Sequence, residues 1–216
     1  SGLGVRMGEI TRAFDQFLDI KLQSSTSSYS FAKSKSEIFD QLESTLIPKN
    51  ATVGTRLREF FDGLSNLAQD PDNANLRRLA LSGANAVSAS ISELHGGLSD
   101  LRTVTHGTLK LTVADFNSTL KNLSHVQNEI LGNSVKSGSP HGLLDRRDTL
   151  LEQLSEIADI SVDYKANGSI TVSLGKLGAV GTLLEGATFS EVTVQSDMNG
   201  VKTFVKDNFG VSSSVH

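Results

Sequence analysis

Cysteine is absent from this chain of 216 residues, and aromatic residues make up only 6% of it. The absence of cysteine excludes disulfides, thiolate metal sites and cysteine nucleophiles. With hydrophobic residues at 38%, the composition predicts a thin core, which suits long helices packed side by side better than a compact enzyme. No run approaches the ~18 consecutive apolar residues of a membrane helix, so the sequence predicts no membrane-spanning segment.

The charge balance also argues against two classes of partner. The net charge is −4, and the two signs are interspersed along the chain. Nucleic acids and anionic membranes are bound by basic patches, so neither is an expected partner. The first residues do not form a basic region followed by an apolar run, and we therefore expect no cleavable secretory signal peptide.

Apolar residues at helical spacing predict four helices. They are expected over residues 7–46, 55–69, 72–131 and 142–157. Pro48 ends the first helix, and Asp70 with Pro71 can cap and open the third. Gly96-Gly97 alone would break the third helix, whereas a continuous helix of sixty residues would be about 90 Å long. The second helix is expected to turn these apolar side chains inward: Leu57, Phe60, Phe61, Leu64 and Leu67.

The second half of the third predicted helix carries a seam with coiled-coil spacing. Its members step by four and three residues through three heptads. They are Leu109, Val113, Phe116, Leu120, Leu123, Gln127 and Ile130. Gln127 is the polar member, and polar residues at such positions often fix register. We interpret the seam as intramolecular core rather than as a stripe that binds a partner.

The period of the apolar residues changes within Leu143–Val162. Leu143, Leu150, Leu154 and Ile157 share one helical stripe, whereas Ile160, Val162 and Tyr164 alternate as in a half-buried strand. A helix therefore leads into a sheet here with almost no linker. The fold class predicted is α+β, with an elongated bundle of long helices over residues 1–158 and a small antiparallel β domain over 159–216.

The first hairpin of the β domain can be placed by register. A two-residue turn would set the apolar residues of its strands on opposite faces. A three-residue loop, Ala166–Gly168, pairs Tyr164 with Ile170 and predicts a left-handed Gly168 in a G1 bulge. Further strands are expected at 181–184, 189–195 and 201–205, with Asn199-Gly200 as the second turn.

Ionisable residues could form two kinds of site, and a structural role is favoured for both. Asp145 and Asp148 could act as an acid–base pair, but carboxylates near a helix N-terminus are stabilised by the helix dipole. A more specific structural prediction is a buried salt bridge between Arg147 and an aspartate that fixes the helix to the sheet. His125 and Glu129 share a helix face but supply only two metal ligands, fewer than a zinc site needs.

The glycines at 175, 178 and 181 do not match the phosphate-binding loop, because Leu177 follows Gly175-Lys176 where that motif has serine or threonine. We therefore predict no catalytic residues, no metal site and no cofactor-binding site.

The joint between helix and sheet carries the most specific motif. It reads Leu143-Leu144-Asp145, Arg147-Asp148, Leu150-Leu151 and Leu154-Ser155, with a strand from Ile160. This pattern resembles the segment that links the helical and β parts in the first flagellar hook-associated proteins, which join hook to filament. Phe60-Phe61 through Asp70-Pro71-Asp72, and Leu111–Ile130 with Asn117 and Gln127, are also similar to that family.

The resemblance implies a structural, non-catalytic protein of the bacterial flagellum. It implies export by the flagellar export apparatus and assembly outside the cell, at the hook–filament junction. The implied partners are the hook protein, neighbouring copies of itself and the next hook-associated junction protein.

The chain departs from the family pattern at both ends. The terminal helices that this family uses for polymerisation are not recognisable, so the sequence resembles a central fragment, which we expect to be monomeric. Two other readings stay open. One is an extracellular helical rod whose β domain acts as an adhesion or binding module, and the other is another axial protein, such as flagellin or a different hook-associated protein.

Overall fold

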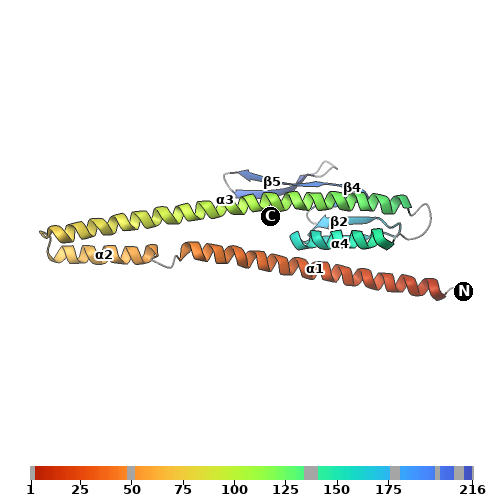
Figure 1. Ribbon diagram of the computed structural model, residues 1–216, viewed down its shortest axis with the longest axis horizontal. Coiled ribbons are helices and arrows are strands. Elements are labelled where there is room, and N and C mark those ends of the chain that lie inside the picture. Colours follow the sequence, from red (N-terminus) through yellow and green to blue (C-terminus); the bar gives the residue numbers. More distant parts are fainter. Residues whose placement is uncertain are drawn as a thin grey trace. The chain divides into compact units, whose positions relative to one another are not determined.

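A computed structural model describes residues 3–47, 52–133, 141–175, 181–197, 200–206 and 212–215. The described residues form four helices: α1 (Leu3–Leu46), α2 (Val53–Gln69), α3 (Ala74–Asn133) and α4 (His141–Ile157) (Figure 1). Each helix lies where the apolar spacing predicted it. α3 continues through Gly96-Gly97 without a break, so the sixty-residue helix is one element.

The chain divides into two compact units that cut across these helices. Unit 1 comprises Ser1–Ser34 and Thr108–His216, and unit 2 comprises Lys35–Gly107. The predicted boundary at residue 158 separates helical from β secondary structure. The boundaries of the compact units lie elsewhere, near residues 34 and 107, because the second half of α3 and the first part of α1 belong to the same unit as the strands.

In unit 2, Gly97 faces a neighbouring helix closely. A Cβ atom added at Gly97 would lie 3.0 Å from the Thr45 methyl group of α1, whereas one added at Gly96 would meet nothing within 4 Å. Gly83 similarly approaches Phe60 of α2, with a Cβ distance of 3.3 Å to the Phe60 Cα. Gly97 and Gly83 therefore allow close packing between helices, whereas Gly96 makes no such contact.

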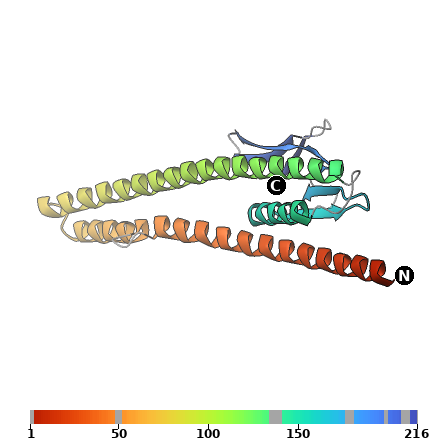
Figure 2. The same ribbon diagram turned by 45° about the vertical axis from the view of Figure 1, so that its right-hand side comes forward.

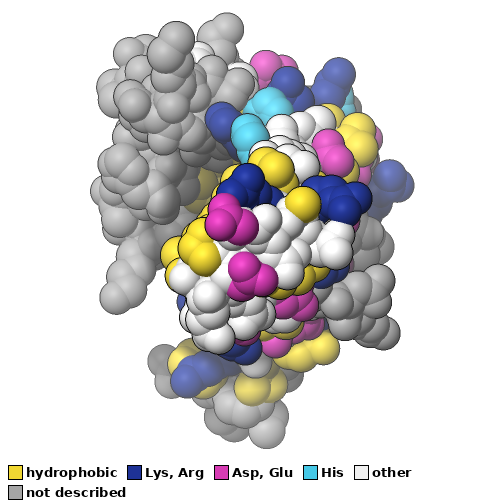
Figure 3. Space-filling model, turned by 90° about the vertical axis from the view of Figure 1, so that its left-hand side faces the viewer, with side chains coloured by type: hydrophobic (Ala, Val, Ile, Leu, Met, Phe, Trp, Pro, Cys, Tyr) yellow, Lys and Arg dark blue, Asp and Glu magenta, His cyan; other side chains and the backbone are white. Residues whose placement is uncertain are grey.

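The inward face of α2 differs from the one predicted. Gly63 is buried, but Leu57, Phe61 and Leu64 are exposed, with 60% of Phe61 accessible to solvent. The apolar stripe of α2 is wider than the surface that its neighbours in unit 2 cover, which is why the pattern misplaced these three side chains. Figure 3 shows hydrophobic side chains on one face of the molecule, interspersed with basic and acidic side chains.

The start of α3 also differs from the prediction. Asn73, not Asp70, is the N-cap: its side-chain oxygen accepts hydrogen bonds from the backbone N–H groups of Asn75 and Leu76, at 3.0 and 3.3 Å. Asp70 instead follows α2, and its carbonyl accepts a bond from the Asn73 N–H. The turn with Pro71 at its second position therefore precedes the helix rather than forming its first turn.

Unit 1 contains two antiparallel sheets. The first has the order β1 (Ile160–Tyr164), β2 (Ile170–Leu174), β3 (Thr182–Glu185) and β4 (Thr188–Phe189). The second has the order β5 (Glu191–Asp197), β6 (Gly200–Lys206) and β7 (Ser212–Val215). In Figures 1 and 2, α4 and β2 lie on one side of the second half of α3, and β5 lies on the other.

The first hairpin has the predicted register. Tyr164 pairs with Ile170 and Val162 with Val172, which confirms the three-residue loop. Gly168 has φ of +83° and donates its N–H to the Lys165 carbonyl, as expected for a turn followed by a left-handed glycine.

Two predictions about the later strands need correction. The segment predicted as one strand over 189–195 is divided at Ser190, and its two parts belong to different sheets. Gly200 was predicted as a turn residue, but it is the first residue of β6 and pairs with Asp197; residues 198–199 lie outside the described residues. Alternation alone does not show which sheet a strand joins.

Candidate functional site at the helix–sheet joint

The core of unit 1 unites α3, α4 and the first sheet. Leu150, Leu151 and Leu154 of α4 are buried, and Leu143 and Leu144 pack against the same core while partly exposed. The buried β residues of this core are Ile160, Val162, Ile170, Val172, Leu183 and Leu184 of the first sheet and Val192 of β5. The leucines at the joint thus hold α4 between the long helix and the sheet.

The seam of α3 lies in this same core. Phe116, Leu120, Leu123, Gln127 and Ile130 are buried, and Val113 packs against them. Leu109, the first residue of the seam, is only partly buried and lines a groove, as do Val113 and Phe116. The heptad spacing is present, but the neighbours of the seam are α4 and the strands of the first sheet.

Arg147 connects α4 to β1 through its guanidinium group. Only 6% of Arg147 is exposed, and its Nη2 lies 2.7 Å from the Asp148 carboxylate. Its guanidinium carbon lies 5.0 Å from the ring centroid of Tyr164 on β1, within the range of a cation–π interaction. The ion pair is local to α4, so the contact that reaches the sheet is the one with the tyrosine ring.

The aspartates do not occupy the helix position inferred from the sequence. The first turn of α4 contains no acidic residue, because the helix begins at His141. Asp145 and Asp148 lie beyond the first turn, where the effect of the helix dipole has faded. Asp145 and Arg146 are exposed, which leaves Arg147 and Asp148 as the members of the charge cluster that contribute to the joint.

The electrostatics around Arg147 are dominated by burial. Desolvation raises the pKa of Asp148 above its usual value, although the adjacent Arg147 acts to lower it. Burial, and then the Asp148 carboxylate, raise the pKa of Tyr164 to about 12, against the lowering effect of Arg147. Gln23 of α1 has the smallest effect and slightly lowers the pKa of Tyr164. The Tyr164 hydroxyl itself has no hydrogen-bond partner of acceptable geometry among the described residues.

Three polar residues of α3 bond backbone atoms of the β part, one in β5 and two in turns of the first sheet. The Asn117 amide both donates to the Val192 carbonyl, at 2.8 Å, and accepts from the Val192 N–H, at 2.9 Å. Ser124 donates to the Ala187 carbonyl, and the Gln127 amide donates to the Gly168 carbonyl at 2.7 Å. Bonds to backbone atoms position a strand independently of its side chains. Sequence reasoning missed the roles of Asn117 and Ser124, and the signal for them was a polar residue adjoining the apolar seam.

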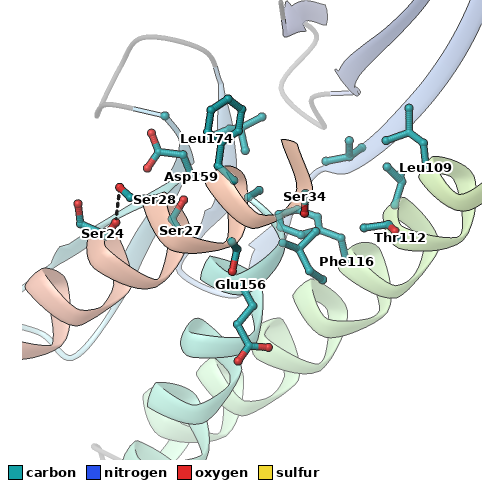
Figure 4. Close-up of a pocket in the computed structure, with 17 residues that line it drawn as sticks. Ser24, Ser27, Ser28, Ser34, Leu109, Thr112, Phe116, Glu156, Asp159 and Leu174 are labelled. Atoms are coloured by element: carbon teal, nitrogen blue, oxygen red, sulfur yellow. Dashed lines mark hydrogen bonds between the residues drawn. The ribbon is translucent and has the colours of Figure 1, made fainter. Parts of the chain in front are cut away.

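A groove of about 740 Å³ lies beside the joint within unit 1. Serines of α1 line one side, and residues of α3, including Leu109 and Phe116, line the other (Figure 4). Ile157, at the end of α4, also lines the groove and is 39% exposed. Ser28 is turned back onto its own helix and donates to the Ser24 carbonyl at 2.9 Å. The described residues that line the groove include the carboxylates of Glu156 and Asp159 but no histidine, lysine or arginine, so none of them pairs a serine with an imidazole or amine base.

The histidines do not assemble a site in the part of the chain that the structure describes. No group of three or more metal-binding side chains occurs among the described residues. His125 and Glu129 both lie on the exposed surface of α3. None of the described helices is long and apolar enough to cross a membrane.

The comparison with known protein families decides the relationship. The sequence model described as "Flagellar hook-associated protein FlgK helical domain" matches residues 39–213. The chain belongs to the FlgK family of flagellar hook-associated proteins. The match includes residues of both units and extends through the strands, so it covers the joint as well as the helices.

Individual FlgK relatives agree with this assignment. The chain is 26% identical to flagellar hook-associated protein 1 of Bacillus subtilis, over 91% of this chain and 41% of the relative. It is 24% identical to the protein of the same name from Salmonella typhimurium, over 94% of this chain and 37% of the relative. The chain therefore spans about two fifths of the length of these relatives.

A solved FlgK structure has the same fold. The flagellar hook junction protein FlgK from Burkholderia pseudomallei superposes with a TM-score of 0.79 at 22% identity. The superposition covers 91% of this chain and 36% of the other. The order of long helices followed by a small antiparallel β part is thus shared with a FlgK structure.

Proposed function

We propose that this chain is part of a structural subunit that joins the hook to the filament of a bacterial flagellum. The observation that carries the proposal is the match of the FlgK helical-domain family to residues 39–213, across helices and strands alike. The geometry supports it, since a continuous sixty-residue helix bonds the backbone of β5 and of the β1–β2 turn through Asn117 and Gln127.

The joint residues serve this role by fixing the sheet and α4 on the long helix. Leu150, Leu151 and Leu154 supply the apolar contact, and Arg147 supplies the contact with Tyr164. A subunit that transmits torque between two stacked structures needs rigid links between its elements. In this proposal the protein has no catalytic role.

The partners and location follow from the same proposal. The full-length protein is expected to contact the hook protein, neighbouring copies of itself and the next hook-associated protein. It would reach its position outside the cell through the flagellar export apparatus, without a cleavable signal peptide.

Two alternatives would use the same fold differently. An adhesion module would present an apolar binding surface on its β part, and another axial flagellar protein would occupy a different position along the flagellum. The family match favours the hook-associated position over both, because it covers the β part together with the helices.

Complementation tests the proposal. A strain of the source bacterium that lacks the full-length gene should carry hooks without attached filaments, and the restored gene should reattach them. Electron microscopy of isolated hook–filament structures measures the outcome. Normal filament attachment in the deletion strain would show that the protein is not the junction subunit.

A matched pair of variants separates the joint from the function as a whole. Arg147→Ala in the full-length protein should lower the fraction of hooks that carry filaments, whereas Arg146→Ala should not, because Arg146 is exposed. Secreted protein levels control for export. Full attachment with Arg147→Ala would contradict the role of Arg147 while leaving the junction function intact.

A further inference from the structure

The passage from the first sheet to the second is very short. β4 ends at Phe189 and β5 begins at Glu191, so Ser190 alone connects strands of different sheets. Ser190 is fully buried, and its N–H donates to the Leu183 carbonyl of β3 at 2.8 Å. The last residue before the second sheet is therefore fixed to the first sheet.

The beginning of the second sheet is fixed to a helix instead. Asn117 of α3 bonds to both the N–H and the carbonyl of Val192. Val192 pairs with Val205 of β6 in an antiparallel ladder, in which a residue directs its two backbone groups either both toward the partner strand or both away from it. Because both groups of Val192 point to Asn117, the amide takes the place of a neighbouring strand at this edge of the second sheet.

A second anchor lies on the same side of α3. Ser124, seven residues after Asn117, donates to the carbonyl of Ala187 between β3 and β4. Seven residues are about two turns of helix, so the two side chains share a face. The segment from Ala187 to Val192 is thus held by α3 at both ends, before and after the crossing between sheets.

We propose that Asn117, through its two hydrogen bonds to Val192, sets the orientation of the second sheet (β5–β7) on α3. Without its two bonds, the second sheet would remain joined to the first through Ser190 and through the Val192 side chain, which lies in the core of unit 1, but its orientation on α3 would be less restricted. The first sheet does not depend on Asn117, because its own core includes Leu183 and Leu184. This inference rests on the geometry of unit 1 and is independent of the proposed role in the flagellum.

Spin-label distances test this role of Asn117 directly, because the chain has no cysteine of its own and labels can be placed at single introduced cysteines. One label at Glu129→Cys on α3 is combined with a second at Gln195→Cys on β5, or with a reference label at Asp163→Cys on β1. All three positions are exposed. Asn117→Ala should broaden the 129–195 distance distribution and leave the 129–163 distribution unchanged. Asn122→Ala, at an exposed asparagine of the same helix, should change neither.

Amide exchange provides a second readout in the unlabelled chain. Losing both hydrogen bonds should accelerate exchange at Val192 about tenfold or more, with no change at Val172 of the first sheet. Asn117→Asp, which keeps an acceptor for the Val192 N–H but loses the donor, guards against a folding defect in the alanine variant and should give a smaller acceleration. An unchanged 129–195 distribution, or equal acceleration in both sheets, would overturn the proposal.

Discussion

At the scale of the residue, the buried polar side chains of unit 1 position backbone groups of the β part through hydrogen bonds. The Gln127 amide group bonds the Gly168 carbonyl, but its own oxygen has no partner among the described residues. An unpaired buried polar atom costs about 1–3 kcal/mol, so Gln127 is retained at some cost in stability. Arg147 is similar, since burial raises the pKa of its partner Asp148 despite the ion pair. Gln127 and Arg147 instead fix the positions of the groups they contact, the Gly168 carbonyl and the Tyr164 ring.

Tyr164 gives a prediction about alkaline pH. Its pKa is raised to about 12 in the folded chain, chiefly by burial, above the usual value near 10. Between these two pH values the unfolded chain loses the phenolic proton while the folded chain keeps it, so stability falls as pH rises. Tyr164→Phe removes the phenol and with it this pH-dependent loss of stability. The free energy of unfolding of the wild type should fall by roughly 2–3 kcal/mol more than that of the variant between pH 10 and 12.

Urea unfolding followed by circular dichroism at several pH values measures this difference. Tyr29→Phe is the matched control, because Tyr29 is the only other tyrosine and 70% of it is exposed. It should lose stability in parallel with the wild type. A parallel loss in Tyr164→Phe as well would show that the ring is not buried in this way.

At the scale of the element, α3 shows how packing can override propensity. Two adjacent glycines should weaken a helix by about 1 kcal/mol each relative to alanine. The helix nevertheless continues, and Gly97 is positioned where a side chain would meet Thr45. Sequence spacing predicted the apolar pattern on both sides of this point, but only the neighbouring helix explains the second glycine.

The glycine pair supplies its own control. Gly97→Leu should destabilise the chain by roughly 1–3 kcal/mol, because the larger side chain must displace α1. Gly96→Leu meets no neighbour within 4 Å and should be neutral or stabilising by up to about 1 kcal/mol. Thermal unfolding of both variants gives the comparison. Equal effects at the two positions would argue against close contact between α1 and α3 at Gly97.

At the scale of the whole molecule, the two units differ in how much they bury. The hydrophobic core cluster belongs to unit 1, whereas Ala80 is the one buried hydrophobic residue among the described residues of unit 2. Unit 2 exposes large apolar side chains on each of its helical segments, among them Phe39, Phe61 and Ile91. Its helices are therefore expected to be less stable than the strands of unit 1.

Hydrogen exchange should reveal this difference along a single helix. Amides from Phe116 to Ile130 of α3 should exchange slowly, because they lie under the core of unit 1. Amides from Leu79 to Gly97 should exchange at least about tenfold faster, because local opening there exposes little buried surface. Mass spectrometry of peptides from the intact chain measures both regions at once, and uniform protection along α3 would contradict the expectation.

Local signals in the sequence were enough to predict the helices and the first strands. The periods of three to four and of two residues placed the helices and the first strands, and the alternation of apolar residues fixed the register of the first hairpin. Contacts between distant segments set the rest: the division at Ser190, the contact between Arg147 and Tyr164, and the two hydrogen bonds of Asn117 to Val192. The physical reason is that periodicity depends on neighbours in the chain, whereas the partner of a polar side chain or a glycine is chosen by segments that folding brings together.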